Sequence, residues 1–498
     1  MISLSSLRDI GESLNPVFIK EMRQYFQNRR MLIFMGLLLL TQFVFTLFFS
    51  SAMKFDTNND SGVGFFLLII SAGAVLSVII CAVGAEQRFA EERSDKELNY
   101  AMLTTLRPAS IIWGKIEGAV VMLLCIFSML LPFLTAAYFM RGVSAASLLV
   151  TLCLFPILVL YTLAGLFAGA FGMKWITGLY LAGLIGSCFI LVPVAFSIVD
   201  DLMNRGSLDS FFWVTVLIEY ELAFLLGVLL FLLTLAVISP PKSNRFCAAK
   251  IYLFFLPVIA LVLMAPYYIA VAGPSYPPEI FYTVEYLFCA FSLAVLTLVA
   301  IFEPPVNSIR VFMKCPRDLV GRFLHFLFSS GFAGTILLTV PVLALPAVLL
   351  PFAKLSRGGT NISWCMLCIL VSFLGYALLS LNLSLRIKLH VPPIIWMIIF
   401  EIAGNIATVI PLTLLDAARH SIPRPLRLVS MVISHIYCFI QAVGSSSSSR
   451  QGIDALKISL TVTGILFLIL LPLIVKAFRI HRHPDIEVKP PTKEMFGK

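Results

Sequence analysis

Residues able to do chemistry are few and scattered in this chain of 498 residues. The sequence contains no G-x-x-x-x-G-K-[ST], the loop that binds phosphate in many nucleotide hydrolases. Cys365 and Cys368 form one CxxC, without the second pair of cysteines or histidines that a zinc site requires. His481 and His483 stand apart from it. We therefore predict no catalytic residue, no metal site and no cofactor bound by this chain itself.

Polar residues within apolar segments form a second group of candidates. A charge inside a bilayer costs about 2.5–3.5 kcal/mol on insertion scales, so each such residue is a candidate for function. Glu401 lies in an apolar segment, Asn405 follows it one turn later, and Asn382 lies in the preceding apolar segment. We predict that these three residues line a substrate pathway. For Glu401, hydrogen bonding between helices is an equal alternative.

The densest charge in the sequence lies between Glu86 and Lys115. Oppositely charged residues four apart stabilise a solvated helix by a few tenths of a kcal/mol per pair. The pairs here are Arg88–Glu92, Glu92–Lys96 and Arg93–Glu97. We expect Pro108 to end this helix and a new helix to enter the membrane near Gly114 and Lys115. Residues 85–115 are thus predicted to form a charged hairpin suited to a soluble partner, with an ordinary solvated loop as the alternative.

The composition indicates what surrounds these residues. The chain is 60% hydrophobic and 12% charged, whereas soluble domains have roughly 25% charged residues. A chain with so little charge must present apolar surface to lipid. The net charge of +10 fits the basic loops on the inner side of membrane proteins better than it fits nucleic-acid binding. We predict an all-α polytopic membrane protein in the cell membrane.

Spans were assigned from apolar runs of roughly 20 residues. Twelve runs qualify: Met31–Met53, Val63–Gly84, Ile116–Met140, Ala145–Ala170, Trp175–Val199, Val214–Ile238, Ile251–Ala272, Thr283–Phe302, His325–Phe352, Ile362–Leu385, Ile394–Leu415 and Ile453–Val475. The basic loops then place both termini in the cytoplasm. The apolar segment 426–443 is read as a re-entrant or interfacial helix. Gly165 and Gly169 form a GxxxG, which is typical of helix packing.

The N-terminal segment, 1–30, is predicted to include a surface helix. Asn15 and Pro16 suit the cap and the first turn of a helix. Its apolar face is predicted to hold Phe18, Met22, Tyr25 and Phe26, and its polar face Lys20, Arg23, Gln24 and Gln27. Such a helix would lie along the cytoplasmic membrane surface.

Two motifs in this order resemble those of ABC-2 type transporter permeases. The opening NPVFIKEMRQYFQNRR is similar to the amphipathic elbow helix of that family, and EERSDKELNYAMLTTLRPASIIWGK is similar to its cytoplasmic signature. Ser94–Asp95 replaces the Gly-Thr that is usual in the family after Glu-Arg. The resemblance covers the first six spans and implies ATPase-coupling roles for Lys20, Glu21, Arg23, Glu91, Glu92, Arg93, Asp95, Lys96, Glu97, Pro108, Gly114 and Lys115.

The resemblance implies a permease subunit, of the exporter type, driven by a separate ABC ATPase. ATP and Mg would bind to that partner, expected in two copies, and further permease or accessory subunits are compatible with the family. The family's substrates include drugs, lipids, polysaccharides, peptides and ions, and the sequence does not choose among them.

The second half of the sequence has a similar order of predicted spans and loops. Residues 31–240 and 251–478 are each predicted to hold six spans, followed by a tail at 479–498. CPRDLVGRF at Cys315–Phe323 parallels RPASIIWGKI at Arg107–Ile116, which favours a degenerate 6+6 duplication. Two other functions remain open: a secondary transporter or channel driven through Glu401, and an integral enzyme acting on lipid-linked substrates.

Overall fold

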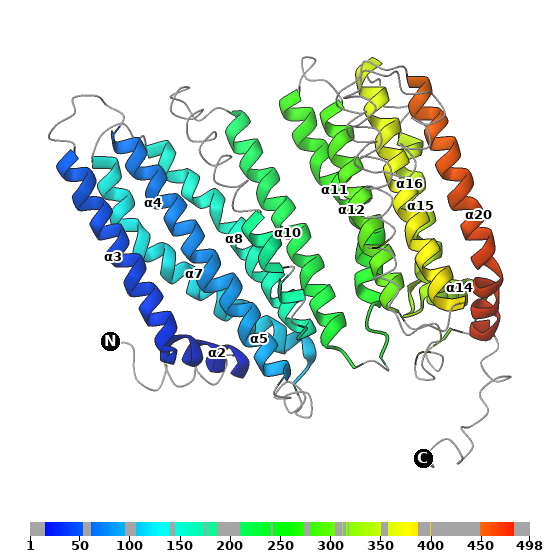
Figure 1. The fold of residues 1–498 in the computed structure, drawn as a ribbon, viewed down its shortest axis with the longest axis horizontal. Coiled ribbons are helices and arrows are strands. Elements are labelled where there is room, and N and C mark those ends of the chain that lie inside the picture. Colours follow the sequence, from blue (N-terminus) through cyan, green and yellow to red (C-terminus); the bar gives the residue numbers. More distant parts are fainter. Residues whose placement is uncertain are drawn as a thin grey trace, which may run out of the picture. The chain divides into compact units, whose positions relative to one another are not determined.

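A computed structural model describes the larger part of the chain. The described residues are 15–52, 61–94, 106–139, 145–173, 176–178, 180–186, 210–240, 243–272, 279–303, 311, 315–316, 318–349, 357–386, 399 and 449–482. Within these ranges the secondary structure consists of thirteen α-helices and one π-helix, without a strand. The all-helical prediction is confirmed for this part of the chain (Figure 1).

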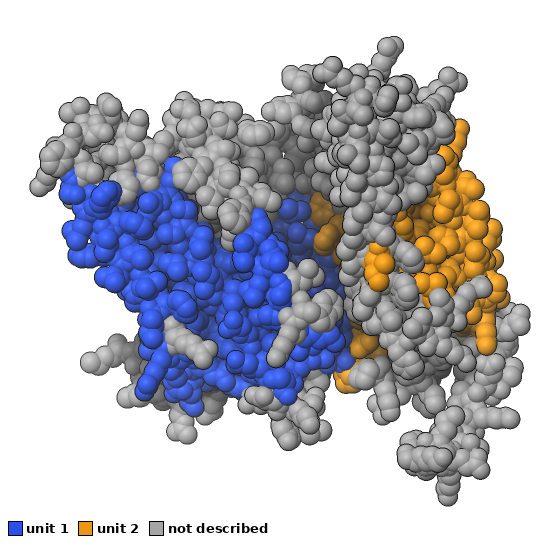
Figure 2. Space-filling model, in the orientation of Figure 1, with its two compact units in different colours: residues 1–239 blue, residues 240–498 orange. Residues whose placement is uncertain are grey.

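The chain divides into two compact units, Met1–Ser239 and Pro240–Lys498, which are coloured separately in Figure 2. The first unit contains α2 (Pro16–Gln27), α3 (Arg29–Ala52), α4 (Ser61–Ser77), the π-helix η1 (Val78–Val83), α5 (Gly84–Ser94), α7 (Pro108–Phe139), α8 (Ala145–Phe171) and α10 (Ser210–Ile238). The second contains α11 (Cys247–Ala272), α12 (Glu279–Phe302), α14 (Leu319–Phe328), α15 (Phe332–Leu349), α16 (Arg357–Arg386) and α20 (Ser449–Arg482).

Long apolar helices confirm a multi-span helical membrane protein, but not the predicted number of spans. Five helices in the described residues are long and apolar enough to cross a membrane, or six if one bent pair counts as a single span. The predicted twelve is therefore corrected to this smaller number for the described part of the chain. Other apolar helices are described over only 10–17 residues, and the predicted span Ile394–Leu415 lies outside the described residues apart from position 399.

The predicted span His325–Phe352 contains α15, but it is not one continuous helix at its start. The chain forms two helices there, α14 and α15, which meet at 93°. At the bend, a Cβ on Gly334 would collide with the Phe326 carbonyl oxygen, so only glycine allows the two backbones to approach this closely. Hydropathy alone missed the bend because Leu319–Leu349 is apolar on both sides of it.

The first unit is held together by close packing of α8 against η1 and α5. As predicted for a GxxxG, Gly165 and Gly169 lie at this contact. A Cβ on Gly165 would overlap the Ala82 carbonyl oxygen, and one on Gly169 would come within 2.6 Å of the Glu86 carbonyl oxygen. This packing holds α5, with its charged residues, firmly against the first unit.

In the second unit, α16 and α20 are joined by polar side chains as well as an apolar core. Ser372 and Ser459 are hydrogen-bonded, with their hydroxyl oxygens 2.9 Å apart. The Thr463 hydroxyl donates to the Val371 carbonyl at 3.0 Å. Leu470 and Ile474 of α20 belong to the apolar core that these bonds flank. Hydrogen bonds between membrane helices typically serve to hold helices together.

Candidate functional site

The amphipathic helix α2 lies across the end of the first unit where α3 and α7 begin and α5 ends (Figure 1). The predicted start is confirmed: Asn15 caps the helix, its side chain accepting from the Val17 amide at 3.1 Å, and Pro16 occupies the first turn. The burial of Tyr25 agrees with the predicted apolar face, and Glu21, which the sequence assigned to neither face, is buried beside it. Phe26, by contrast, is half-exposed. The face of α2 that packs against the protein is therefore determined by the ion pairing of Glu21 as well as by apolar side chains.

Two glycines on α7 provide the surface on which α2 rests. A Cβ on Gly114 would stand 2.9 Å from the Phe18 amide nitrogen and from the Asn15 and Val17 side chains. A Cβ on Gly118 would stand 3.1 Å from the Glu21 Cβ. Asn15 also donates from Nδ2 to the Ser110 carbonyl at 2.7 Å. Because neither glycine has a side chain, α2 can lie directly on the backbone of α7.

Lys115 is the centre of an ion cluster that joins α2, α5 and α7. Its ammonium group binds the Glu21 carboxylate of α2 and lies 2.7 Å from the Glu92 Oε2 of α5. Lys20 completes the cluster from α2, with its Nζ 2.8 Å from the Glu92 Oε1. Lys115 and Glu21 are buried, with side chains 4% and 5% exposed, whereas Lys20 is 46% exposed. The cluster therefore runs from the protein interior to its surface.

Arg88 and two aromatic residues line the cluster. The Arg88 guanidinium lies over the Tyr25 ring, 3.4 Å from its centroid, and 4.0 Å from a Glu21 oxygen. The Lys115 ammonium lies 4.9 Å from the centroid of Phe89. Such positions over a ring face favour a cation. Burial raises the pKa of Tyr25 above its usual value, because the phenolate would lose its hydration.

The predicted Arg88–Glu92 pair is not formed in α5, although Glu91, where the solvated helix is predicted to begin, is exposed. Glu86 and Phe89 are fully buried, and the Arg88 side chain points to α2 rather than pairing with Glu92 along its own helix. The Glu86 carboxylate accepts from the Thr177 hydroxyl at 2.5 Å. The charges that suggested solvation are used instead to attach α5 to neighbouring helices.

The predicted hairpin is also shifted. The helix predicted to start near Gly114 begins earlier, at Pro108, because proline suits the first turn, where its missing N–H is not needed. Gly114 and Lys115 therefore lie almost two turns inside α7 rather than at its start. Asp95, Lys96 and Glu97 lie outside the described residues.

Part of the site is exposed to solvent. Gln87, Glu91 and Ser94 of α5 are exposed, as are Arg23 and Lys20 of α2. Arg93 is partly buried, and its side chain packs over Gly172, whose φ of +63° ends α8 in a left-handed turn. The described coupling residues thus divide into a buried group, Glu21, Gly114 and Lys115, an intermediate group, Glu92, Arg93 and Pro108, and an exposed group.

Of the three predicted pathway residues, only Asn382 lies in the described part of the chain. Asn382 is buried on α16, and its Nδ2 donates to the Leu378 carbonyl at 3.0 Å and to the Leu466 carbonyl of α20 at 3.4 Å. Those bonds are typical of helix packing. Glu401 and Asn405 lie outside the described residues.

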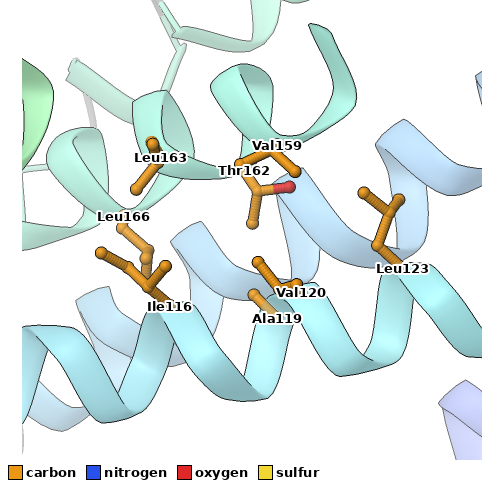
Figure 3. A pocket seen from close by; sticks show the side chains of 8 residues that line it. All are labelled: Ile116, Ala119, Val120, Leu123, Val159, Thr162, Leu163 and Leu166. Carbon is orange, nitrogen blue, oxygen red and sulfur yellow. The ribbon is translucent and has the colours of Figure 1, made fainter. Parts of the chain in front are cut away.

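A cavity between α7 and α8 is too small for a transported molecule. Its space for solvent is about 10 Å³, roughly that of one water molecule. Figure 3 shows the eight side chains around it: Ile116, Ala119, Val120, Leu123, Val159, Thr162, Leu163 and Leu166. The hydroxyl of the one polar member, Thr162, donates to the Leu158 carbonyl at 2.8 Å. The crevice is therefore an apolar gap between helices.

A second ion pair, in the second unit, was not singled out from the sequence. The Lys250 ammonium at the start of α11 lies 2.6 Å from Glu303, which follows α12, and both side chains are fully buried. Lys250 also donates to the Ser329 carbonyl at 2.5 Å, and the Thr335 hydroxyl donates to the other Glu303 oxygen at 2.5 Å. The pair joins α11 and α12 to both arms of the α14–α15 bend.

The positions of Lys250 and Glu303 in the sequence could have indicated this pair. Glu303 is the single acidic residue at the end of a long apolar run. Lys250 is the first charged residue of α11, the helix that opens the second unit. A carboxylate and an ammonium at the ends of neighbouring apolar helices are expected to pair, because burying either charge alone costs free energy. No comparable signal identifies Arg88, whose partner lies on a distant segment.

Comparison with known proteins gives no match: not with any family model, nor with curated proteins, nor with solved structures. Among the described residues, no group of three or more His, Cys, Asp or Glu side chains is placed to hold a metal ion.

Proposed function

We propose that this chain is the permease subunit of an ATP-driven transporter, of the exporter type, and that a separate ATPase binds the end of the first unit. The observation that carries the proposal is the Lys115 cluster. It connects a surface helix, α2, to the charged helix α5 and the long apolar helix α7. The sequence resemblance to ABC-2 permeases assigns ATPase coupling to the same segments.

The arrangement suits the transmission of motion. An ATPase that moved α5 would pull on Glu92, and through Lys115 on α7 and Glu21 of α2. Charged groups held by partners in a poorly solvated site resist separation strongly. Displacement of one helix is therefore passed to the other two instead of being absorbed by side-chain rotation.

Supporting this role, the exposed face of α5 carries polar residues while its opposite face is fixed in the unit. Gln87, Glu91 and Ser94 face outward, and Glu86 and Phe89 are buried. A soluble partner could bind the outward residues without entering the apolar part of the protein. A secondary transporter or channel gives no reason for a cluster of this kind at the end of the helices.

The proposal is tested by reversing an exposed charge on this face. Glu91→Arg is expected to leave the unfolding temperature unchanged, because Glu91 is exposed, and to remove the ATPase and its ATP hydrolysis from the purified complex. Lys457→Glu, an exposed charge reversal on α20, is the matched control and should retain both. Full ATP hydrolysis by the Glu91→Arg complex, or a wild-type protein that transports in its membrane without any ATPase, would refute the proposal.

A further inference from the structure

The short helix α14 in the second unit has an unusual direction. It meets α15 at 93°. The α14–α15 pair is apolar enough to be one of the candidate spans. If α15 crosses the bilayer along its normal, the bend places α14 close to the membrane plane. Its ten residues extend about 15 Å at 1.5 Å per residue.

The surface of α14 is divided by residue type. Four large apolar side chains are exposed: Leu319 by 70%, Val320 by 68%, Phe323 by 44% and Leu324 by 48%. At 100° per residue they share one arc of the helix. Arg322 and His325 occupy a different arc and are partly exposed, whereas Phe326 is buried against the unit.

We propose that α14 is an interfacial membrane helix, whose exposed apolar arc inserts among lipid acyl chains just beneath the headgroups. A contiguous exposed apolar patch of this size marks a surface that is covered in the working protein. A helix with an apolar arc, a basic residue on another arc and an in-plane direction is suited to the boundary between headgroups and acyl chains. The Arg322 side chain would then lie at the level of the headgroups.

The neighbouring helix indicates lipid rather than a soluble protein as the occupant. The Phe323 ring lies 6.2 Å from the Phe478 ring of α20, measured between centroids. In the two turns before Lys476, which precedes Phe478 by two residues, α20 exposes Leu471, Leu473 and Val475. This helix is long enough to span the membrane. The exposed arc of α14 is thus continuous with a surface that lipid must cover.

The ion pair of the second unit fixes the direction of α14. Lys250 binds the carbonyl of Ser329, the residue that caps the end of α14, and Glu303 accepts from Thr335 in the first turn of α15. Asn244 accepts from the Ser330 amide at 2.7 Å within the bend itself. Both arms are therefore fastened to α11 and α12, and the apolar arc keeps its orientation to the bilayer.

Photo-crosslinking of the full-length protein tests this inference. A benzophenone amino acid is placed at Val320, and the protein is reconstituted into vesicles of phosphatidylcholine and phosphatidylglycerol. After irradiation, mass spectrometry is expected to find phospholipid adducts at this site. The same probe at Phe43, which is 55% exposed on the apolar α3, should give lipid adducts, and at Gln87, exposed on α5, it should give none.

A probe at Leu319 provides a second position if the Val320 variant fails to fold. An adduct yield at both α14 positions close to that at Phe43 supports the proposal. An adduct yield no higher than at Gln87 would overturn it, since the helix would then face water. Cross-linking of α14 to a second protein in native membranes, with no lipid adduct, would overturn it in favour of a docking site.

Discussion

Each unit contains a lysine held by carboxylates near the beginning of an apolar helix, but the two sites differ in how they meet solvent. In the first unit, Lys115 shares two carboxylates, and the chain of charges ends at Lys20, which is 46% exposed. In the second unit, Lys250 and Glu303 form a single pair with no exposure of either side chain. A cluster with an exposed end can respond to a partner, whereas a closed pair can only hold the fold together.

The difference extends to what each site connects. The first cluster joins a surface helix, α2, to α5 and α7. The second joins the starts and ends of membrane helices across the α14–α15 bend. We therefore assign transmission of motion to the first site and maintenance of the bend to the second. The following predictions are designed to separate these two roles.

The largest effect is expected from Lys250→Met. This change leaves the Glu303 carboxylate buried without its cation, and breaking a buried pair in this way costs about 3–5 kcal/mol. We expect a loss of that size in the free energy of unfolding, measured in detergent micelles. The double variant Lys250→Met/Glu303→Leu should recover most of the loss, because no uncompensated charge remains. If Lys250→Met were as stable as the wild type, the Glu303 carboxylate would have to be reached by solvent, and the pair would not be fully buried.

A smaller loss is expected from Lys115→Met in the first unit. Glu92 keeps Lys20 as a partner, and its side chain is 13% exposed, so part of the charge remains compensated. We expect a loss in unfolding free energy at the lower end of roughly 3–5 kcal/mol. The measurement is the same as for Lys250→Met, performed in parallel. A loss that exceeds that of Lys250→Met would contradict the distinction between an open and a closed site.

The glycine platform under α2 gives the next effect. In Gly114→Ala the new Cβ would stand 2.9 Å from the Phe18 backbone nitrogen, so α2 must shift on α7. Overpacking of this kind costs about 1–3 kcal/mol. Gly36→Ala on α3 is the matched control, since a Cβ there meets nothing within 4 Å. Equal unfolding free energies for the two alanine variants would mean that α2 does not rest on α7.

The smallest effect on stability is expected from Lys20→Ala. Its bond to Glu92 lies partly in solvent, and exposed ion pairs typically contribute about 0–1 kcal/mol. We expect a loss within that range that shrinks as salt is raised, measured by unfolding at low and high ionic strength. A loss comparable to that of Lys115→Met would show that Lys20 holds the fold together as much as Lys115 does.

Helix positions were largely predictable from the sequence, whereas the contacts of the charged residues were not. Apolar runs predict α3 and α10 nearly to their ends and α7 at its C-terminal end, because lipid selects continuous apolarity. The Asn15 cap was found because capping depends only on neighbouring residues. The bend at Gly334 was missed, since an apolar sequence does not reveal where a backbone turns.

Charge was misjudged for a different reason. Arg88 and Glu92 were expected to pair along one helix, but helix α2 offers each of them a nearer partner in space. Likewise, the burial of Glu21 depends on Lys115, which lies 94 residues away in the sequence. Pairings across the fold cannot be read from local spacing. Glu91 and Glu21 are both candidates from the sequence, but only the structure shows that Glu91 is exposed while Glu21 is buried.

The most direct test is hydrogen exchange of the α2 amides, residues 16–27, in the complex with its ATPase, with and without ATP. We predict that ATP changes the exchange of these amides in the wild type and in Lys457→Glu. In Lys115→Met the ATPase should remain bound, but the change should be confined to α5. An ATP response in α2 that is unaltered by Lys115→Met, or absent from the wild type, would contradict the account. The Lys115 cluster would then not be the connection between α5 and α2.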